Sequence, residues 1–162
     1  MVCVYLGLGS NIDPEENLRL GIRELRRIFG EIDLSAVYSS AAIGFDGADF
    51  LNMVVRLQST DSPQAIQGQA ELIHVLAGRD RSSDKYSSRP LDIDLLLYGD
   101  ELIDEPDLKL PRRDVLDYSF VLRPLAELDP GLVHPRTGNT MAEHWREFDA
   151  SSHPLRRVDI IL

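Results

Sequence analysis

Residues 91–98 read Leu-Asp-Ile-Asp-Leu-Leu-Leu-Tyr, a pattern that predicts a β-strand. Side chains along a strand point alternately to its two faces. Apolar residues at alternate positions are therefore expected on one side and the aspartates on the other: Leu91, Ile93, Leu95 and Leu97 against Asp92 and Asp94. The pattern predicts a strand that packs one face in a core and carries two neighbouring carboxylates on the other.

The segments before this strand predict the fold class. Each has the apolar period of a strand or of a helix: strands at 2–8, 31–40 and 50–57, and helices at 13–30 and 62–78. With 91–98 the order is β-α-β-β-α-β, which is typical of an α+β, ferredoxin-like fold. In such a fold two helices cover one face of an antiparallel sheet. We expect the other face to be free.

Both helices begin at recognisable start signals. Asp13 precedes Pro14, and Glu16 follows at the spacing of a capping box, so Asp13 is expected to accept hydrogen bonds from the first turn. Ser62 and Pro63 form a similar start for the second helix. The residues expected to face the core recur at helical spacing: Leu18, Ile22, Leu25 and Phe29 in the first helix, and Ile66, Ala70, Ile73 and Ala77 in the second.

Beyond residue 98 the pattern is weaker. Short apolar pieces predict helices near 120–128 and 141–148 and a last alternating run at 158–162. No linker rich in Pro, Gly or Ser divides the chain. We therefore expect one domain over 1–162, with a core at about 1–98 and a C-terminal extension at about 99–162.

Composition excludes several classes of protein. The chain has 162 residues with 17 Lys and Arg against 27 Asp and Glu, and its net charge of −10 disfavours a nucleic-acid partner. Cys3 is the only cysteine, so no internal disulfide can form. No apolar run reaches the ~20 residues of a membrane span, and the first residues lack the pattern of a signal peptide. We expect a cytoplasmic protein without a membrane partner.

The two aspartates are flanked by unusually many basic residues for so acidic a chain. Arg79, Arg81, Lys85 and Arg89 precede them in a polar segment expected to be a mobile loop, and Arg112 and Arg113 follow. Paired carboxylates suit Mg²⁺, and guanidinium groups bind phosphate oxygens. The combination favours phosphoryl transfer. The alternatives are an exposed strand face with two solvated aspartates, and arginines that form ordinary surface ion pairs.

Other nucleotide and nucleophile motifs are missing. There is no P-loop, and Gly7-x-Gly9 lacks the third glycine of a dinucleotide fingerprint, so this turn is expected to shape a strand end. No Gly-x-Ser-x-Gly accompanies the four histidines. His74 is expected to serve packing or the edge of the site.

Four ordered motifs resemble the 6-hydroxymethyl-7,8-dihydropterin pyrophosphokinase family. They are Gly9-Ser10-Asn11, Phe50-Leu51-Asn52, Arg89-Pro90-Leu91-Asp92-Ile93-Asp94 and Ser119-Phe120-Val121-Leu122-Arg123-Pro124-Leu125, and the resemblance runs from about Val4 to Pro135. It implies a ferredoxin-like core and transfer of the diphosphate of ATP to the pterin hydroxymethyl group, with release of AMP, in folate biosynthesis. The implied partners are small molecules, and we expect a monomer or weak homodimer.

The resemblance also implies residue roles. Asp92 and Asp94 would hold two Mg²⁺ ions that bridge the phosphates of ATP, and with Arg79 and Arg89 they form the catalytic set. Arg81 and Lys85, on the loop that closes over the phosphates, would bind ATP together with Arg79, Arg89, Arg112 and Arg113. The pterin would contact the backbone between Ser40 and Ile43, the Asn52 amide and the ring of Phe120, with Phe50 beside it.

Several positions depart from the family pattern. His74 stands where a glutamate is common, Ser87-Ser88 where Gly-Pro is common, Tyr86 where a tryptophan is common, and Arg112 where a histidine is common. Three interpretations follow: the diphosphokinase itself, a divergent non-catalytic paralogue that binds a pterin or a nucleotide, and an acidic interaction module without a ligand.

Overall fold

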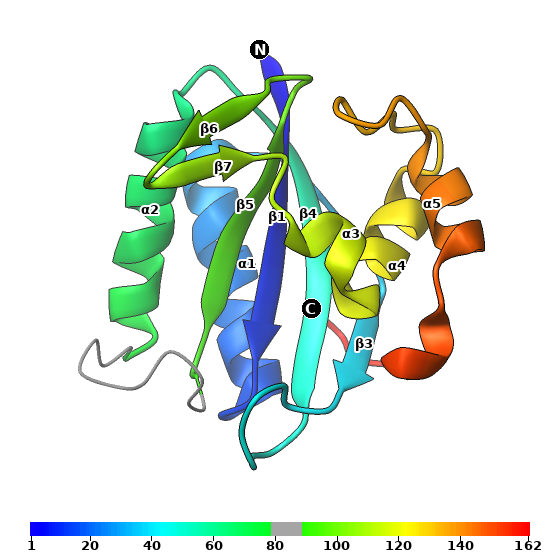
Figure 1. The fold of residues 1–162 in the computed structure, drawn as a ribbon. Helices are drawn as coiled ribbons and strands as arrows, with labels where there is room; N and C mark the ends of the chain where they lie inside the picture. The colour runs from blue at the N-terminus through cyan, green and yellow to red at the C-terminus, as the bar shows by residue number, and fades with distance from the viewer. Residues whose placement is uncertain (79–88) are drawn as a thin grey trace.

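The computed structural model describes residues 1–78 and 89–162. Within these ranges one antiparallel sheet has the strand order β5-β1-β4-β3-β8, and Figure 1 labels the first four of these strands. β2 also pairs with β4. Its strands are β1 (Val2–Ser10), β2 (Ile32–Leu34), β3 (Val37–Ser40), β4 (Phe50–Ser59), β5 (Asp92–Tyr98) and β8 (Arg156–Val158). A separate hairpin joins β6 (Ile103–Glu105) and β7 (Leu108–Leu110).

The order β5-β1-β4-β3, with a helix after β1 and another after β4, confirms the α+β ferredoxin-like class. The helices are α1 (Pro14–Phe29), α2 (Pro63–Leu76), α3 (Asp114–Asp117), α4 (Ser119–Leu128) and α5 (Met141–Glu147), with a short 3₁₀ turn at Ala150–Ser152. No helix in the two described ranges combines the length and the apolar character needed to cross a membrane.

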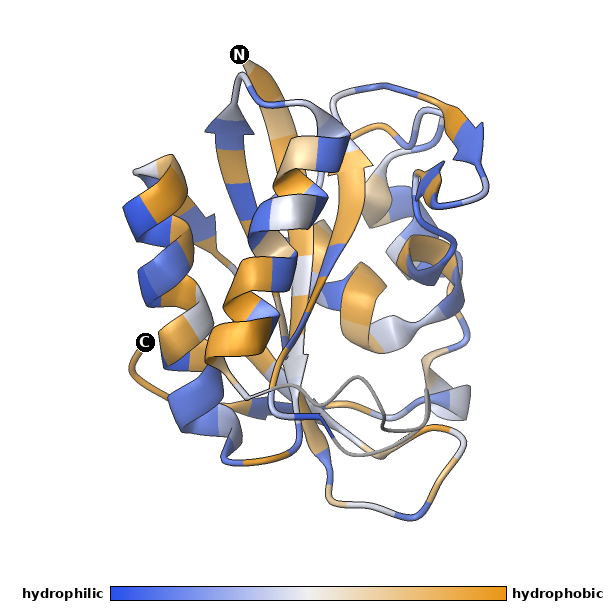
Figure 2. Cartoon of the chain, turned by 90° about the vertical axis from the view of Figure 1, so that its left-hand side faces the viewer, coloured by the Kyte–Doolittle hydropathy of each residue, from blue (hydrophilic) through white to orange (hydrophobic). Residues whose placement is uncertain are grey.

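One face of the sheet packs against α1 and α2, as their spacing predicts. The buried helix residues are Leu18, Ile22 and Leu25 from α1 and Ile66, Ala70 and Ile73 from α2, and they join Val4, Leu6, Leu8 and Ile93 in a single cluster. Figure 2 shows hydrophilic and hydrophobic bands along both helices. Burial of one apolar side of each helix explains this face of the fold.

The expectation that the other face is free was wrong. Residues 99–162 place α3 and α4 on it, and a second buried cluster forms there (Figure 1). The sheet contributes Tyr5, Val54, Leu96 and Leu97, and the helices contribute Val115, Val121, Leu122 and Leu125. These sheet residues would otherwise expose a large apolar surface to water, so the extension completes the core.

The expected alternation of β5 is interrupted in its second half. Tyr5 pairs with Leu97 and Leu6 pairs with Leu95, which leaves Leu96 as an extra residue, a β-bulge. Leu97 therefore joins the second cluster rather than the cluster of Leu95, which corrects its predicted side. Asp92 and Asp94 precede the bulge and keep the predicted alternation.

Two local predictions also need correction. Asp13 has a φ of 42° and makes no capping hydrogen bond; instead the Nδ2 group of Asn17 donates to the carbonyl of Ile12 at 2.6 Å. Residues 31–40 form two strands, because Ser35 interrupts the run and exchanges hydrogen bonds of 2.9 Å and 2.8 Å with the backbone of Val54. Both short strands still pair with β4.

Candidate active site

Three neighbouring strands bring Asp92, Gly9 and Asn52 into one row across the sheet. Gly9 of β1 pairs with Asp92 of β5 on one side and with Asn52 of β4 on the other. Paired residues in a sheet share a face, and strands lie about 4.8 Å apart. Asp92 and Asn52 thus face the same side, two strand spacings apart, and the residue between them has no side chain.

The next row of the same face repeats this arrangement. Gly7 pairs with Asp94 and with Val54, and Val54 belongs to the second core cluster. The carboxylates therefore lie on the face that the C-terminal extension covers. Gly7 and Gly9 are residues of a long strand rather than of a turn, which corrects the expectation that they shape a strand end.

Asp94 stands in surroundings that oppose its negative charge. Its side chain and that of Asp92 are each 30% exposed. Burial, followed by the charge of Asp92, raises the pKa of Asp94 to about 7, and the opposing effects of Arg112 and Arg89 do not offset this. A cation that binds between or beside the oxygens of such a carboxylate pair stabilises its negative charge.

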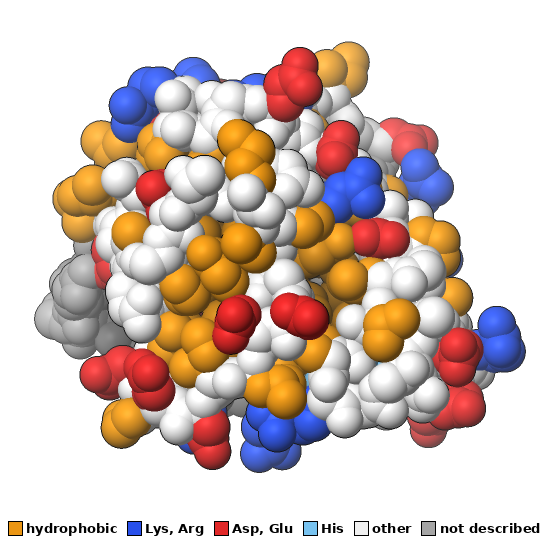
Figure 3. All heavy atoms as spheres, turned by 90° about the horizontal axis from the view of Figure 1, so that it is seen from above, with side chains coloured by type: hydrophobic (Ala, Val, Ile, Leu, Met, Phe, Trp, Pro, Cys, Tyr) orange, Lys and Arg blue, Asp and Glu red, His pale blue; other side chains and the backbone are white. Residues whose placement is uncertain are grey.

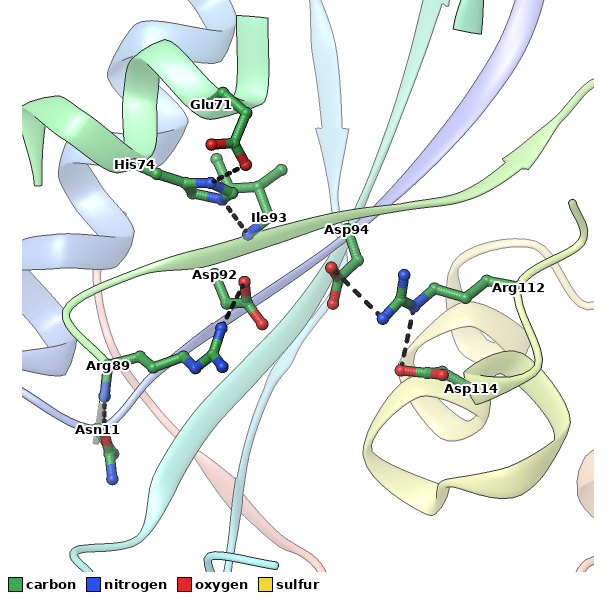
Figure 4. Close-up of polar contacts among 9 residues, drawn as sticks. All are labelled: Asn11, Glu71, His74, Arg89, Asp92, Ile93, Asp94, Arg112 and Asp114. Carbon is green, nitrogen blue, oxygen red and sulfur yellow. Dashed lines mark hydrogen bonds and ion pairs between the residues drawn. The ribbon is translucent and has the colours of Figure 1, made fainter. Parts of the chain in front are cut away.

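An arginine approaches each aspartate, as Figure 4 shows. The Nη1 atom of Arg89 lies 3.7 Å from Oδ1 of Asp92, and Nη2 of Arg112 lies 3.8 Å from Oδ1 of Asp94. Both separations exceed a hydrogen bond, so these are ion pairs without a fixed geometry. Asp114, at the start of α3, lies 3.2 Å from Nε of Arg112 and orients that guanidinium.

Asn11 fixes the backbone of Arg89, a role that our sequence interpretation did not assign. Its Oδ1 accepts a hydrogen bond of 2.7 Å from the backbone nitrogen of Arg89, and its own backbone nitrogen donates to the Arg89 carbonyl at 3.1 Å. The motif Gly9-Ser10-Asn11 was visible in the sequence, but its partner is 78 residues away. Asn11 therefore joins the end of β1 to the segment that leads into β5.

Asn52 offers one polar atom to the face that it shares with the aspartates. Its Nδ2 group donates to Oγ of Ser40 at 2.8 Å and to the carbonyl of Tyr38 at 3.2 Å. Within the described residues its Oδ1 accepts no hydrogen bond. A Cβ atom at Gly9 would lie 3.5 Å from that oxygen and 3.8 Å from the ring of Phe50. Gly9, the Asn52 amide oxygen and the Phe50 ring are therefore adjacent.

The aromatic residues expected around a pterin come from two elements that pack together. Phe50 begins β4 and meets Phe45 edge to face, with ring centroids 6.3 Å apart. Phe120 belongs to α4, which packs on β3 and β4, and its ring stacks on Tyr118 at 5.0 Å. Ile43 lies in the loop between those strands and is exposed. Tyr118 is an addition that the sequence motifs did not single out.

Some of the expected site residues are not brought to the aspartates. The side chain of Arg113 is 86% exposed and pairs with Asp117 at 3.5 Å. Arg79, Arg81 and Lys85, together with the loop predicted around them, lie outside the described residues. Among the described residues no group of three or more Asp, Glu, His or Cys side chains could hold a metal. A cation at Asp92 and Asp94 would need water or phosphate oxygens as well, which is how Mg²⁺ is usually bound.

Comparisons with known proteins show the family to which the chain belongs. A family model described as 7,8-dihydro-6-hydroxymethylpterin-pyrophosphokinase (HPPK) matches residues 5–130. A protein of Aquifex aeolicus named 2-amino-4-hydroxy-6-hydroxymethyldihydropteridine pyrophosphokinase is 36% identical over 137 residues, covering 83% of this chain and 85% of that protein. A Synechocystis protein of the same name is 35% identical over 150 residues, covering 91% and 76%.

Solved structures share the fold. The wild-type HPPK-DHPS of Plasmodium falciparum superposes with a TM-score of 0.72 over 90% of this chain, at 13% sequence identity. The chain spans 44% of that longer protein.

Proposed function

The chain belongs to the 7,8-dihydro-6-hydroxymethylpterin-pyrophosphokinase family, and on this basis we propose that its reaction takes place on the sheet face of Asp92, Gly9 and Asn52. The reaction transfers the diphosphate of ATP to 6-hydroxymethyl-7,8-dihydropterin in folate biosynthesis. The hydroxymethyl oxygen bonds to the β-phosphorus, the bond from that phosphorus to the α-phosphate oxygen breaks, AMP leaves, and the hydroxyl proton is released. A non-catalytic paralogue is not favoured, because the Aquifex aeolicus and Synechocystis relatives are pyrophosphokinases by name.

One observation carries the proposed site. A carboxylate pair and an outward amide oxygen stand on the same face, with only glycine between Asp92 and Asn52. Two substrates can then meet over Gly9, with the phosphates beside the carboxylates and the pterin beside Asn52. Holding two reactants in one orientation is the main task of an enzyme that transfers phosphoryl groups.

We propose that Asp92 and Asp94 hold the metal, as two Mg²⁺ ions shared with the ATP phosphates. The oxygen-only donor pair, its partial burial and the raised pKa of Asp94 fit a hard divalent cation. When bound, Mg²⁺ supplies positive charge that offsets the charge of the transferred diphosphate. Arg89 and Arg112, now 3.7–3.8 Å from the carboxylates, are near enough to turn toward phosphate oxygens. Arg79, Arg81, Lys85 and Arg113 remain proposed ATP-binding residues.

The acceptor side is assigned to the strand ends and α4. Oδ1 of Asn52 would accept a hydrogen bond from the edge of the pterin, while Ser40 holds the amide nitrogen in place at 2.8 Å. Phe50 and Phe120 would enclose the flat ring, and the backbone from Ser40 to Ile43 would complete the pocket. A heteroaromatic ring with polar edges needs this mixture of apolar walls and few fixed polar partners.

The reaction is tested by its products. The purified chain is incubated with ATP, 6-hydroxymethyl-7,8-dihydropterin and Mg²⁺, and the products are separated and weighed by mass spectrometry. We expect AMP and the pterin diphosphate in equal amounts, and no product when EDTA removes the metal. Formation of ADP with a pterin monophosphate, or no reaction at all, would contradict the proposed function.

Further properties stay proposals of the same kind. We propose a cytoplasmic enzyme that is a monomer or a weak homodimer and works on small molecules alone. Light scattering during gel filtration at several protein concentrations tests the oligomeric state: a stable tetramer would contradict it.

A further inference from the structure

His74 is a buried histidine that contacts the strand between the two aspartates. It lies in the last turn of α2 and is 3% exposed. Its Nε2 atom accepts a hydrogen bond of 2.8 Å from the backbone nitrogen of Ile93, the residue between Asp92 and Asp94 (Figure 4). Among residues 1–78 and 89–162, β5 is the last strand of the sheet on that side, so no described strand accepts this N–H group. The imidazole takes the place of that neighbour.

The hydrogen bond determines which ring nitrogen carries the proton. Because the Ile93 N–H group is the donor, Nε2 must present its lone pair, and the proton of the neutral ring is on Nδ1. Oε1 of Glu71, one helical turn earlier, lies 3.1 Å from Nδ1 and accepts that proton's hydrogen bond. Glu71, His74 and the Ile93 amide thus form a chain that fixes the ring's tautomer and its orientation.

The peptide held in this way links the two carboxylates. Asp92 and Asp94 lie on one face and repel each other, and each must keep its direction if both are to bind a cation. A strand at the edge of a sheet is free to tilt or bulge when its outward N–H group has no partner. Fixing the amide of Ile93 restricts that movement at the position where it would change the distance between the carboxylates.

We infer that Glu71 and His74 are positioning residues for the diphosphate-transfer site, acting through the Ile93 amide on Asp92 and Asp94. The inference rests on the proposed function of that face. Groups that orient metal ligands typically change metal affinity or activity by about ten- to hundredfold when removed. A buried histidine that only fills space would affect stability and leave cation binding unchanged.

The chain contains a matched control for this test. His134 is also 3% exposed, and its Nδ1 atom accepts a hydrogen bond of 3.2 Å from the backbone nitrogen of Arg136. It lies between α4 and α5. His134→Leu and His74→Leu each remove a buried acceptor of one backbone N–H group. His74→Gln keeps a carbonyl oxygen that can reach the Ile93 amide.

The experiment measures Mn²⁺ binding by electron paramagnetic resonance in the presence of a non-hydrolysable ATP analogue, together with kcat and KM for ATP. For His74→Leu we expect Mn²⁺ affinity and kcat to fall about ten- to hundredfold with a smaller change in KM. His74→Gln should recover both to within about threefold, and His134→Leu should leave both unchanged although it lowers the melting temperature. Equal Mn²⁺ affinity and kcat in His74→Leu and His134→Leu would overturn the inference.

Two further measurements test the inference if the His74→Leu variant does not fold. Glu71→Ala changes a partly exposed side chain, and we expect it to weaken Mn²⁺ binding about threefold and to alter the ¹⁵N signals of the His74 ring. Unchanged ring signals and Mn²⁺ affinity would contradict the inference. The wild-type chain separates the two proposals: if it makes no AMP the proposed function fails, whereas an active wild type with an unaffected Glu71→Ala variant contradicts the positioning role alone.

Discussion

Asp94 gives the clearest residue-level link between charge and stability. Its pKa is about 7 in the folded chain against an ordinary value of 3.8, so the folded chain binds this proton more tightly than the unfolded chain does. The contribution of Asp94 to the free energy of unfolding of the metal-free protein therefore falls as pH rises from about 4 to about 7, and levels off above.

We predict that Asp94→Asn removes most of this fall, because the amide does not ionise. Urea unfolding at pH 5 and pH 8, without divalent metal, measures it. Asp100→Asn, at an exposed position, serves as the control and should keep the wild-type pH dependence. An Asp94→Asn variant with the same pH dependence as the wild type would contradict the charge environment described here.

Gly9 tests the space between the carboxylates and Asn52. A methyl group there would make ordinary contacts, 3.5 Å from Oδ1 of Asn52 and 3.8 Å from the Phe50 ring, so Gly9→Ala should fold normally. The same methyl group would obstruct a pterin that donates to Oδ1. We predict about a tenfold loss of pterin affinity, equivalent to ~1.4 kcal/mol, with a smaller change for ATP. Calorimetric titration of both ligands decides the matter, and an unchanged pterin affinity would place the pterin elsewhere.

Two of the roles that sequence analysis did not assign, those of Asn11 and His74, share one property. The spacing of Asp92 and Asp94 in the sequence suffices to propose them, and the resemblance to the family suffices to propose Asn52. Asn11 and His74 act on backbone groups of Arg89 and Ile93, which are distant along the chain. Side chains that serve backbone N–H groups leave no pattern in the sequence, because any backbone can be their partner.

At the scale of elements, α4 joins the second core to the proposed pterin pocket. Leu122 is 1% exposed in that core, and Phe120 precedes it on the same helix. Truncation of a buried leucine typically costs about 2–5 kcal/mol. We predict this loss for Leu122→Ala, measured by denaturant unfolding, together with weaker pterin binding under conditions where the variant is folded.

Leu25→Ala is the matched control for that prediction. Leu25 is equally buried in the first core, on α1. The Leu25→Ala variant should lose similar stability and keep its pterin affinity. If both variants bind the pterin equally well, α4 does not contribute to the pocket.

The elements differ in how far the sequence reveals them. The β-α-β-β-α-β order and the core faces of α1 and α2 were predictable, because long periodic runs mark them. The cover of the second face was not, since α3 and α4 come from short apolar pieces without a sustained period. The bulge at Leu96 was also not predictable, because a strictly alternating pattern does not indicate where one extra residue is inserted.

For the whole molecule, the two cores share their strands. Tyr5 lies in the second core between Val4 and Leu6 of the first, and Val54 lies between Met53 and Val55 in the same way. Neither core can lose its sheet while the other keeps it. We therefore predict that residues 1–162 unfold as one domain in a single transition.

Trp145 is the only tryptophan and packs against the second core from α5, so its fluorescence reports on the extension. Its transition in urea should coincide with that of far-ultraviolet circular dichroism. A tryptophan transition at clearly lower urea would divide the chain into two units.

For the whole molecule, the chain is acidic, but two arginines lie beside the site aspartates. The end that carries the N-terminus and the β6–β7 hairpin shows acidic, basic and hydrophobic side chains intermixed (Figure 3). Among the described residues, Arg89 and Arg112 each lie within 4 Å of one of the two site aspartates. In a chain of net charge −10, we propose that these arginines are where anionic phosphates bind.

The central claim is that Asp92 and Asp94 form the diphosphate-transfer site, and AMP formation by Asp92→Asn and Asp94→Asn variants tests it most directly. Both substitutions keep the size of the side chain and remove the charge that would hold Mg²⁺. With ATP, the pterin and saturating Mg²⁺, the wild-type chain should form AMP and pterin diphosphate in equal amounts, while both folded variants should form almost none. AMP formation at the wild-type rate by either folded variant would contradict the claim.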